Sequence, residues 1–367
     1  MPLSLLLKEI RHNPMLWLLV FVPVVFAAAT LRPEAHAMLF ILSVLAIVPL
    51  AALLSHGTEA VAAKTGDAAG GLLNSTLGNL TELVIALSAL HAGQYVLVKA
   101  SVAGAIVANT LFMLGMSFLL GGVKYHVQDY NRVNARFQAG LLFLATVALL
   151  IPSALAEADS APVAGFTQTL SVGLAVLLIV GYALGMLFSL KTHPELFASA
   201  AHTEEAEEAP WPLGLAVTVL VGVTVVVALV SEIFVESVQK AAETFGMTPA
   251  FVGFVVVALV GGAAEMASAF AGARKNRLDL SVGIALGSAA QIALFVAPVL
   301  VLLSYVIGPT PMDLQLWPGA VVMIFLATLT AALVTNSGRS SWFVGVLVLM
   351  VYAIFAMTLY LLPPQVR

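Results

Sequence analysis

The chain has 367 residues, of which 61% are hydrophobic and only 9% are charged. A soluble domain carries about 25% charged residues, and a mean hydropathy of +1.06 indicates that lipid is the solvent for much of the surface. The formal net charge of −4 argues against a nucleic-acid partner. The absence of cysteine excludes disulfides and thiolate metal sites, and the seven His residues lack the spacing of a zinc site.

Apolar segments long enough to cross a membrane follow one another along the chain. A spanning helix needs about 20 mostly apolar residues, and lipid-exposed backbone must satisfy its own hydrogen bonds, so each segment is expected to be a helix. The predicted class is an all-α polytopic membrane protein with about eleven spans. They are 14–31, 37–62, 70–91, 94–120, 135–156, 164–190, 212–238, 248–273, 279–308, 315–336 and 341–363.

The basic residues predict the orientation of these spans. With the N-terminus inside and the first span retained rather than cleaved as a signal peptide, eleven of the fifteen Lys and Arg residues fall on the inner side. The outer four are Arg32, Lys99, Lys240 and Arg367. The positive-inside rule therefore predicts a cytoplasmic N-terminus and an external C-terminus. The short termini and loops favour a prokaryotic plasma membrane.

A polar segment divides the chain, and the halves on either side resemble each other. Residues 191–210 contain the acidic run EEAEE at 204–208, which is either a solvated hinge or a cytoplasmic patch that attracts cations. An offset of 183 residues aligns four pairs, which are Gly70 with Gly253, Gly78 with Gly261, Ala86 with Ala269 and Gly104 with Gly287.

Five helices in each half make the second half enter the membrane from the opposite side, as in the inverted repeats of secondary transporters. The expected organisation is an N-terminal segment with helix 1 (1–36), repeat 1 (37–190), an acidic linker (191–210) and repeat 2 (211–367).

The same offset aligns Glu82 with Glu265, near the middle of two apolar spans. Placing a carboxylate in the membrane interior costs several kcal/mol, so an acidic residue at such a position is expected to have a function. Two structural roles are the alternatives: a Glu paired with a buried basic residue, or a protonated Glu that only forms hydrogen bonds. Neither span contains a basic residue, which argues against the first. Because a carboxyl group in a dry site tends to hold a proton, a pair of them could exchange protons for a cation.

Oxygen-bearing residues accompany both acids. Helical periodicity places Asn79, Gly78 and Ser75 on the face of Glu82, while Gly261 beside Glu265 would offer backbone carbonyls. Further polar atoms come from the following helices, at Asn109, Ser288 and Gln291. Such a set suits a hard cation such as Ca²⁺, which takes six to eight oxygen ligands, although interhelical hydrogen bonds and close glycine packing are the alternative roles.

Two stretches carry a family resemblance: GGLLNSTLGNLTELVIALSAL around Glu82 and VGGAAEMASAFAG around Glu265. Each is similar to a repeat signature of the calcium/cation–proton exchanger family, within the cation/Ca²⁺ exchanger superfamily. The resemblance runs from about residue 45 to about 310 and implies eleven helices, an inverted five-helix repeat, an acidic linker and Ca²⁺/H⁺ antiport. The family's second signature usually has Asn and His where this chain has Gly262 and Met266, and serines are common at Ala105 and Ala108.

The predicted function is a secondary antiporter that exchanges Ca²⁺ or a related divalent cation for H⁺, with the bilayer as its surroundings and no bound cofactor. An exchanger of Na⁺, K⁺ or Mn²⁺ is the nearest alternative. A passive channel would favour a continuous polar lining, whereas the acids here are concentrated at two points. An intramembrane enzyme would need a nucleophile–base set or HExxH, and the sequence contains neither.

Overall fold

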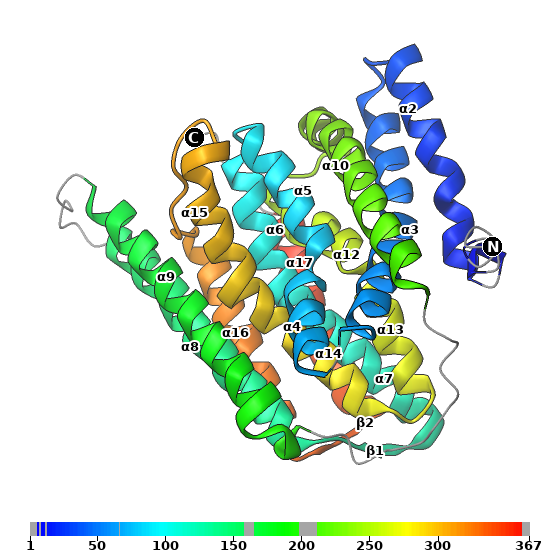
Figure 1. Ribbon diagram of the computed structural model, residues 1–367. Helices are drawn as coiled ribbons and strands as arrows, with labels where there is room; N and C mark the ends of the chain where they lie inside the picture. Colours follow the sequence, from blue (N-terminus) through cyan, green and yellow to red (C-terminus); the bar gives the residue numbers. More distant parts are fainter. Residues whose placement is uncertain are drawn as a thin grey trace.

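The computed structural model describes residues 6, 9–11, 13–65, 67–157, 165–197 and 211–361, with the side chains of 67–69, 75, 156 and 157 also left out. The predicted acidic run at 204–208 and the last residues, including Arg367, therefore lie outside the described residues. The described part is a bundle of helices with one short two-stranded ribbon (Figure 1).

The first half of the chain forms η1 (Pro14–Val20), α2 (Phe21–Leu31), α3 (His36–Ala62), α4 (Asp67–Leu77), α5 (Leu80–His91), α6 (Tyr95–Val107), η2 (Ala108–Met113), α7 (Leu114–Tyr125), β1 (Val127–Asp129), α8 (Arg132–Glu157), α9 (Phe166–Leu187), η3 (Phe188–Thr192) and η4 (Pro194–Leu196). The second half forms α10 (Leu213–Thr244), α11 (Pro249–Phe251), η5 (Val252–Val257), α12 (Ala258–Gly261), α13 (Ala263–Arg274), α14 (Leu278–Gln291), η6 (Ile292–Val296), α15 (Ala297–Ile307), α16 (Pro318–Val334), β2 (Arg339–Ser341) and α17 (Trp342–Leu361).

Within the described ranges, eight helical stretches are long and apolar enough to cross a membrane. A ninth is added if Pro249–Gly261 and Ala263–Arg274, which meet at a bend of 60°, form one span. The helices α5 and α16 are apolar but shorter. The predicted class, a helical integral membrane protein, is confirmed.

The expectation that every span is one continuous helix is wrong at two places. The segment 70–91 divides into α4 and α5 at Gly78 and Asn79, and the segment 248–273 bends at Gly262. Asn79 (φ −96°, ψ 29°) and Gly262 (φ −80°, ψ 7°) both leave helical geometry. Glycine is a weak helix former and Asn competes for backbone hydrogen bonds, so these residues favour a break.

The two broken helices run in opposite directions through the bundle (Figure 1). From its break, α5 leads toward Gly93 at one end, where Gly93 lies beside Pro309. From its own break, α13 leads to the other end, where the carbonyl of Ala273 accepts a hydrogen bond from Gln128 of β1. Each is followed by a helix interrupted by one π-helical turn, η2 after α6 and η6 after α14.

The helix α6 packs closely against the start of the second broken helix. A Cβ atom built on Gly104 would lie 2.1 Å from the backbone oxygen of Phe254, and one on Gly253 would lie 2.6 Å from Cβ of Ala100. Both glycines therefore allow two helix backbones to touch. Gly287, which the sequence offset aligns with Gly104, has no such neighbour within 4 Å.

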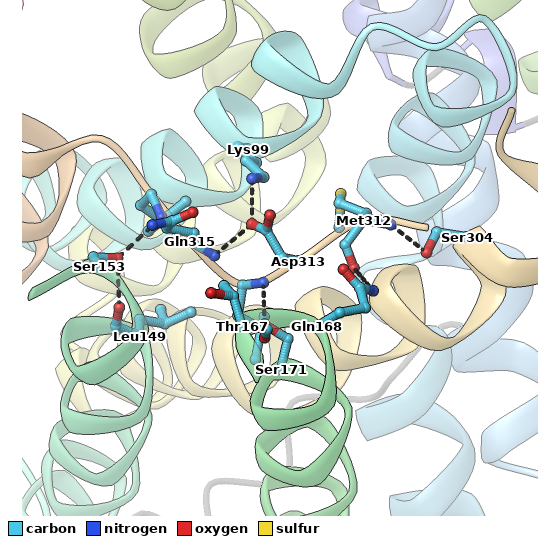
Figure 2. A network of polar contacts seen from close by, with 12 residues as sticks. Lys99, Leu149, Ser153, Thr167, Gln168, Ser171, Ser304, Met312, Asp313 and Gln315 are labelled. Atoms are coloured by element: carbon cyan, nitrogen blue, oxygen red, sulfur yellow. Dashed lines mark hydrogen bonds and ion pairs between the residues drawn. The ribbon is translucent and has the colours of Figure 1, made fainter. Parts of the chain in front are cut away.

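The two ends of the bundle are tied differently. At the ribbon end, defined by β1 and β2, the strands pair antiparallel with Gln128 opposite Ser340, and Arg339 forms an exposed ion pair with Asp129 at 2.7 Å. At the strap end, residues 308–317 lie across the tips of several helices (Figure 2).

Hydroxyl groups on three helices hold the strap by accepting hydrogen bonds from its backbone N–H groups. They are Ser304 to Met312, Ser171 to Leu314 and Ser153 to Leu316, at 2.7, 3.0 and 3.0 Å. In the middle of the strap, Lys99 of α6 pairs with Asp313 at 2.6 Å, with side chains only 21% and 28% exposed.

We predict that Gly104→Ala strongly destabilises the protein, because its methyl group meets backbone rather than a movable side chain. Overpacking of this kind costs about 1–3 kcal/mol. Gly287→Ala, in open space within a helix, should leave stability unchanged or slightly raised. Thermal unfolding of the two variants in the same detergent measures the difference, and equal effects would contradict the assigned contact.

We predict that Asp313→Asn lowers the unfolding temperature more than Asp129→Asn. The first change leaves the half-buried Lys99 without its counter-ion, at a cost of about 1–3 kcal/mol. The second removes an ion pair that is more than 70% exposed on both sides, where water screens the loss. Thermal unfolding in parallel compares them, and a larger effect of Asp129→Asn would show that the strap contact is unimportant.

Candidate cation site

Each of the two predicted acids stands in the first turn of a helix that begins at a break. Glu82 is the third residue of α5, after the turn at Gly78 and Asn79, and Glu265 is the third residue of α13, after Gly262. The amino end of a helix carries a partial positive charge, which stabilises a carboxylate in its first turn. The breaks therefore place both acids where a negative charge is tolerated inside the bundle.

Each acid also lies against a glycine of the other half of the chain. A Cβ atom built on Gly261 would lie 3.0 Å from Cγ and 3.6 Å from Oε1 of Glu82. One built on Gly78 would lie 3.8 Å from Oε1 of Glu265 and 3.6 Å from Oε1 of Gln291. The two broken helices thus meet at their breaks, and the missing side chains leave room for the carboxylates.

Two hydrogen bonds join the breaks to α14. The hydroxyl of Ser288 donates to Oε2 of Glu265 at 2.5 Å. The amide of Asn79 donates through Nδ2 to Oε1 of Gln291 at 2.5 Å, although the two residues are 212 positions apart in the chain. Asn79, Glu265, Ser288 and Gln291 are therefore brought together as one polar group.

Three buried polar atoms of the site have no hydrogen-bond partner, namely Oε1 of Glu82, Oδ1 of Asn79 and Nδ2 of Asn109. Asn79 and Asn109 are only 2% and 1% exposed. Because buried polar atoms nearly always have a hydrogen-bond partner, each of these three exceptions needs an explanation. Two of the three are oxygens beside the breaks, and both are available to a cation.

Periodicity on a continuous helix predicted Ser75, Gly78 and Asn79 on the face of Glu82. The break at Gly78 and Asn79 interrupts that face, so Gly78 lies against Glu265 instead. The side chain of Ser75 lies outside the described residues. Asn109 is in η2, and its Oδ1 lies 3.6 Å from where a Cβ of Gly262 would be.

A small cavity of about 10 Å³ adjoins Glu82, with room for about one water molecule. Its lining comes from α5, α6, the second broken helix and η6, and includes Ser101, Ala105, Ala258 and Ile292. Sequence reasoning missed Ser101 and Ala105 as neighbours of Glu82. Sequence patterns singled out Gly104 and Asn109 in this stretch, but only the fold shows which of its residues face the acid.

The site is acidic and lacks a compensating base. Within the described part of the chain, neither Glu82 nor Glu265 forms an ion pair. In the described ranges, no group of three or more His, Cys, Asp or Glu residues is arranged so that it could hold a metal ion. The centre therefore consists of two carboxylates surrounded by amides, a hydroxyl and helix ends.

The fold and the site define a helical membrane protein with two buried acidic residues, one at each of two helix breaks. The family model for sodium/calcium exchanger proteins matches residues 35–191 and 215–361. The chain belongs to this family.

Several relatives are similar over nearly the whole chain. A Ca²⁺/H⁺ antiporter of Synechocystis sp. is 40% identical over 364 residues, which cover 95% of this chain and 97% of the relative. The Ca²⁺/H⁺ antiporter ChaA of Bacillus subtilis is 40% identical over 330 residues, 89% of this chain and 93% of the relative.

Solved structures agree with the fold. Native YfkE superimposes with a TM-score of 0.82 at 35% identity, covering 95% of this chain and all of that one. The H⁺/Ca²⁺ exchanger CAX superimposes with a TM-score of 0.71 at 17% identity, over 95% of this chain and 91% of its own, and this likeness concerns the fold alone.

Proposed function

We propose that this protein is a secondary antiporter that exchanges Ca²⁺, or a related divalent cation, for H⁺. The observation that carries the proposal is the meeting of Glu82 and Glu265 at two helix breaks, each against a glycine of the other half. Relatives at 40% identity are Ca²⁺/H⁺ antiporters, which are transporters and not enzymes.

Charge balance explains how the site couples the two ions. In a medium of low dielectric, two ionised carboxylates without a base repel each other strongly. One divalent cation neutralises both charges, and two protons do the same. The site is therefore stable with either one divalent cation or two protons bound, and binding of the cation requires release of the protons. A resident cofactor has no role in this exchange.

The ligands of the cation are the two carboxylates with oxygens of their neighbours. Oδ1 of Asn79 has no hydrogen-bond partner. The hydroxyl oxygen of Ser288 is hydrogen-bonded to Glu265, and Oε1 of Gln291 is hydrogen-bonded to Asn79. Asn109 lies next to the second break. The carbonyl groups at the helix ends near Gly78 and Gly261 have no N–H donor within their own helices, so they can also bind a cation. Ser75, in α4, is the remaining candidate. Together they approach the six to eight oxygens that Ca²⁺ takes.

The proposed architecture has eleven spans. Treating α4 with α5 as a second broken span and α16 as a short span adds two to the nine apolar stretches already described. Residues 37–190 and 211–367 are then inverted repeats, with 1–36 as an extra helix and 191–210 as a linker. The opposite directions of α5 and α13 and the family match in two separate stretches support this division.

The ribbon end is the proposed cytoplasmic end. It holds Lys124, Arg132, Arg274 and Arg339, which lie in the ribbon or beside it. The basic bias predicts an N-terminus in the cytoplasm and a C-terminus outside the membrane, which we take to be a prokaryotic plasma membrane.

Selectivity among cations is set at the second break. An exchanger of Na⁺, K⁺ or Mn²⁺ would use the same two acids, but a divalent ion matches their combined charge better. A passive channel is disfavoured because apolar residues line most of the cavity at Glu82. Vesicles that carry a pH gradient separate these functions, because only an exchanger moves the cation against its own gradient in response to protons.

We predict that Glu82→Gln and Glu265→Gln each abolish proton-driven Ca²⁺ uptake in proteoliposomes. The substitution keeps the shape of the side chain but removes its charge and its proton exchange. Glu→Asp at either site should retain partial transport with altered affinity, because the charge remains while its reach shortens. Glu243→Gln, an exposed position on α10, is the matched control and should transport at the parental rate.

Reconstituted amounts and thermal unfolding must match among these variants, so that loss of folding is not mistaken for loss of transport. Near-parental uptake by either Gln variant would refute a mechanism that needs both carboxylates. Ca²⁺ uptake that persists without a pH gradient would refute the exchange step.

We predict that Gly262→Asn combined with Met266→His sharpens the preference for Ca²⁺. A Cβ at position 262 has neighbours at 3.3–3.6 Å, among them Cε of Met266 and Oδ1 of Asn109, so the double change replaces an apolar contact by an amide and an imidazole. Competition of Mn²⁺, Mg²⁺ and Na⁺ against Ca²⁺ uptake measures the effect. An unchanged competition profile would show that these positions do not set selectivity.

A further inference from the structure

A groove of about 320 Å³ lies between α8 and α16, and neither Glu82 nor Glu265 lines it. Its walls are mainly apolar and include Ala139, Gly140, Phe143, Phe325, Leu329 and Ala332. The volume lies at the lower end of the range for ligand pockets, roughly 300–1,000 Å³. The proposed exchange does not use this groove.

The groove owes its shape to small residues between large ones. A Cβ built on Gly140 would meet nothing within 4 Å. Phe143 and Phe325 are 53% and 38% exposed, although both are large and apolar.

Thr328 lines the groove, and its buried hydroxyl is hydrogen-bonded to that of Thr146 at 2.9 Å. The hydroxyl of Thr335, the other threonine of the lining, donates to the carbonyl of Ala331. Both threonine hydroxyls are therefore already paired, and the groove suits a hydrocarbon chain.

One end of the groove is positively charged. Arg136 lines it, and the guanidinium donates to Oδ1 of Asn336 through Nε and Nη2 at 2.9 and 2.6 Å. Arg132, one helical turn earlier and also exposed, shares the same oxygen at 3.4 Å. Neither arginine forms an ion pair with a carboxylate in the described ranges. Two cations thus share one neutral acceptor.

This arrangement fits an amphipathic anion. Arginine forks match phosphate oxygens, and basic pockets between membrane helices bind anionic head groups. The arginines lie in the first turns of α8, near the ribbon end, where the polar surface of the bilayer is expected. The apolar walls extend from there along α8 and α16 into the hydrocarbon region.

We propose that the groove between α8 and α16 is a binding site for an anionic phospholipid. Its phosphate lies at Arg136 and Arg132, and an acyl chain lies between Phe143 and Phe325. A zwitterionic lipid would leave the two guanidinium charges less well balanced. A second copy of this chain would have to fill the groove with a side chain and supply an anion to the arginines.

The test is thermal unfolding of the purified full chain in detergent, without Ca²⁺, with added phosphatidylglycerol or phosphatidylcholine of identical acyl chains. A ligand that binds only the folded state raises the unfolding temperature. We expect phosphatidylglycerol to raise it and phosphatidylcholine to raise it much less. Lipid retained in native mass spectrometry gives the apparent affinity directly.

Two variants separate the charge from the groove. Arg132→Gln with Arg136→Gln keeps side chains that can donate to Asn336 and should weaken phosphatidylglycerol binding at least about tenfold, the equivalent of 1.4 kcal/mol. Gly140→Leu fills the groove without a change of charge and should weaken binding similarly. Arg339→Gln, at the same end but outside the groove, is the matched control and should bind like the parent.

Equal binding of both lipids would overturn the proposal in favour of nonspecific attraction. So would a loss of phosphatidylglycerol binding in Arg339→Gln as large as that in the double Arg variant. A dimer in native mass spectra that Gly140→Leu dissociates would overturn it in favour of a second copy. If the double Arg variant does not fold, unchanged phosphatidylglycerol binding by Gly140→Leu still overturns it. None of these outcomes depends on ion exchange, so the proposed antiport can fail or hold separately.

Discussion

The meeting of two broken helices at their breaks is the contact on which the rest of the structure depends. A carboxylate inside an apolar bundle needs positive potential and space. The amino ends of α5 and α13 supply the potential, and Gly261 and Gly78 leave the space. Because each acid relies on a glycine from the other half, neither half forms the site alone.

Close helix packing holds this contact in register. At Gly104 and Gly253 the backbones of α6 and of the second broken helix touch directly, with no side chain between them. A hydrogen bond between Asn79 and Gln291 then links the first break to α14. In a bilayer there is little hydrophobic force between helices, so contacts of this type decide how they associate.

The two halves of the site are unequal despite the likeness of their sequences. Glu265 receives a hydrogen bond from Ser288, whereas Oε1 of Glu82 is buried without a partner. Gly262 stands where Asn79 stands in the first half, and so the second break has no amide of its own. Asn109 approaches it from η2 instead, and its Nδ2 remains unpaired. Three of the buried polar atoms without partners, on Asn79, Glu82 and Asn109, thus lie beside the breaks.

The sequence alone determined the class of the protein and its two central acids. Apolar segments of spanning length can only be helices in lipid, and a Glu without a basic partner in such a segment stands out by its desolvation cost. The tertiary structure decided which atoms meet. Periodicity grouped Gly78 with Glu82 because it assumed an unbroken helix, while the break moves Gly78 to Glu265. Contacts between residues about 200 positions apart, such as Asn79 with Gln291, depend on how helices cross, and local sequence patterns do not specify that crossing.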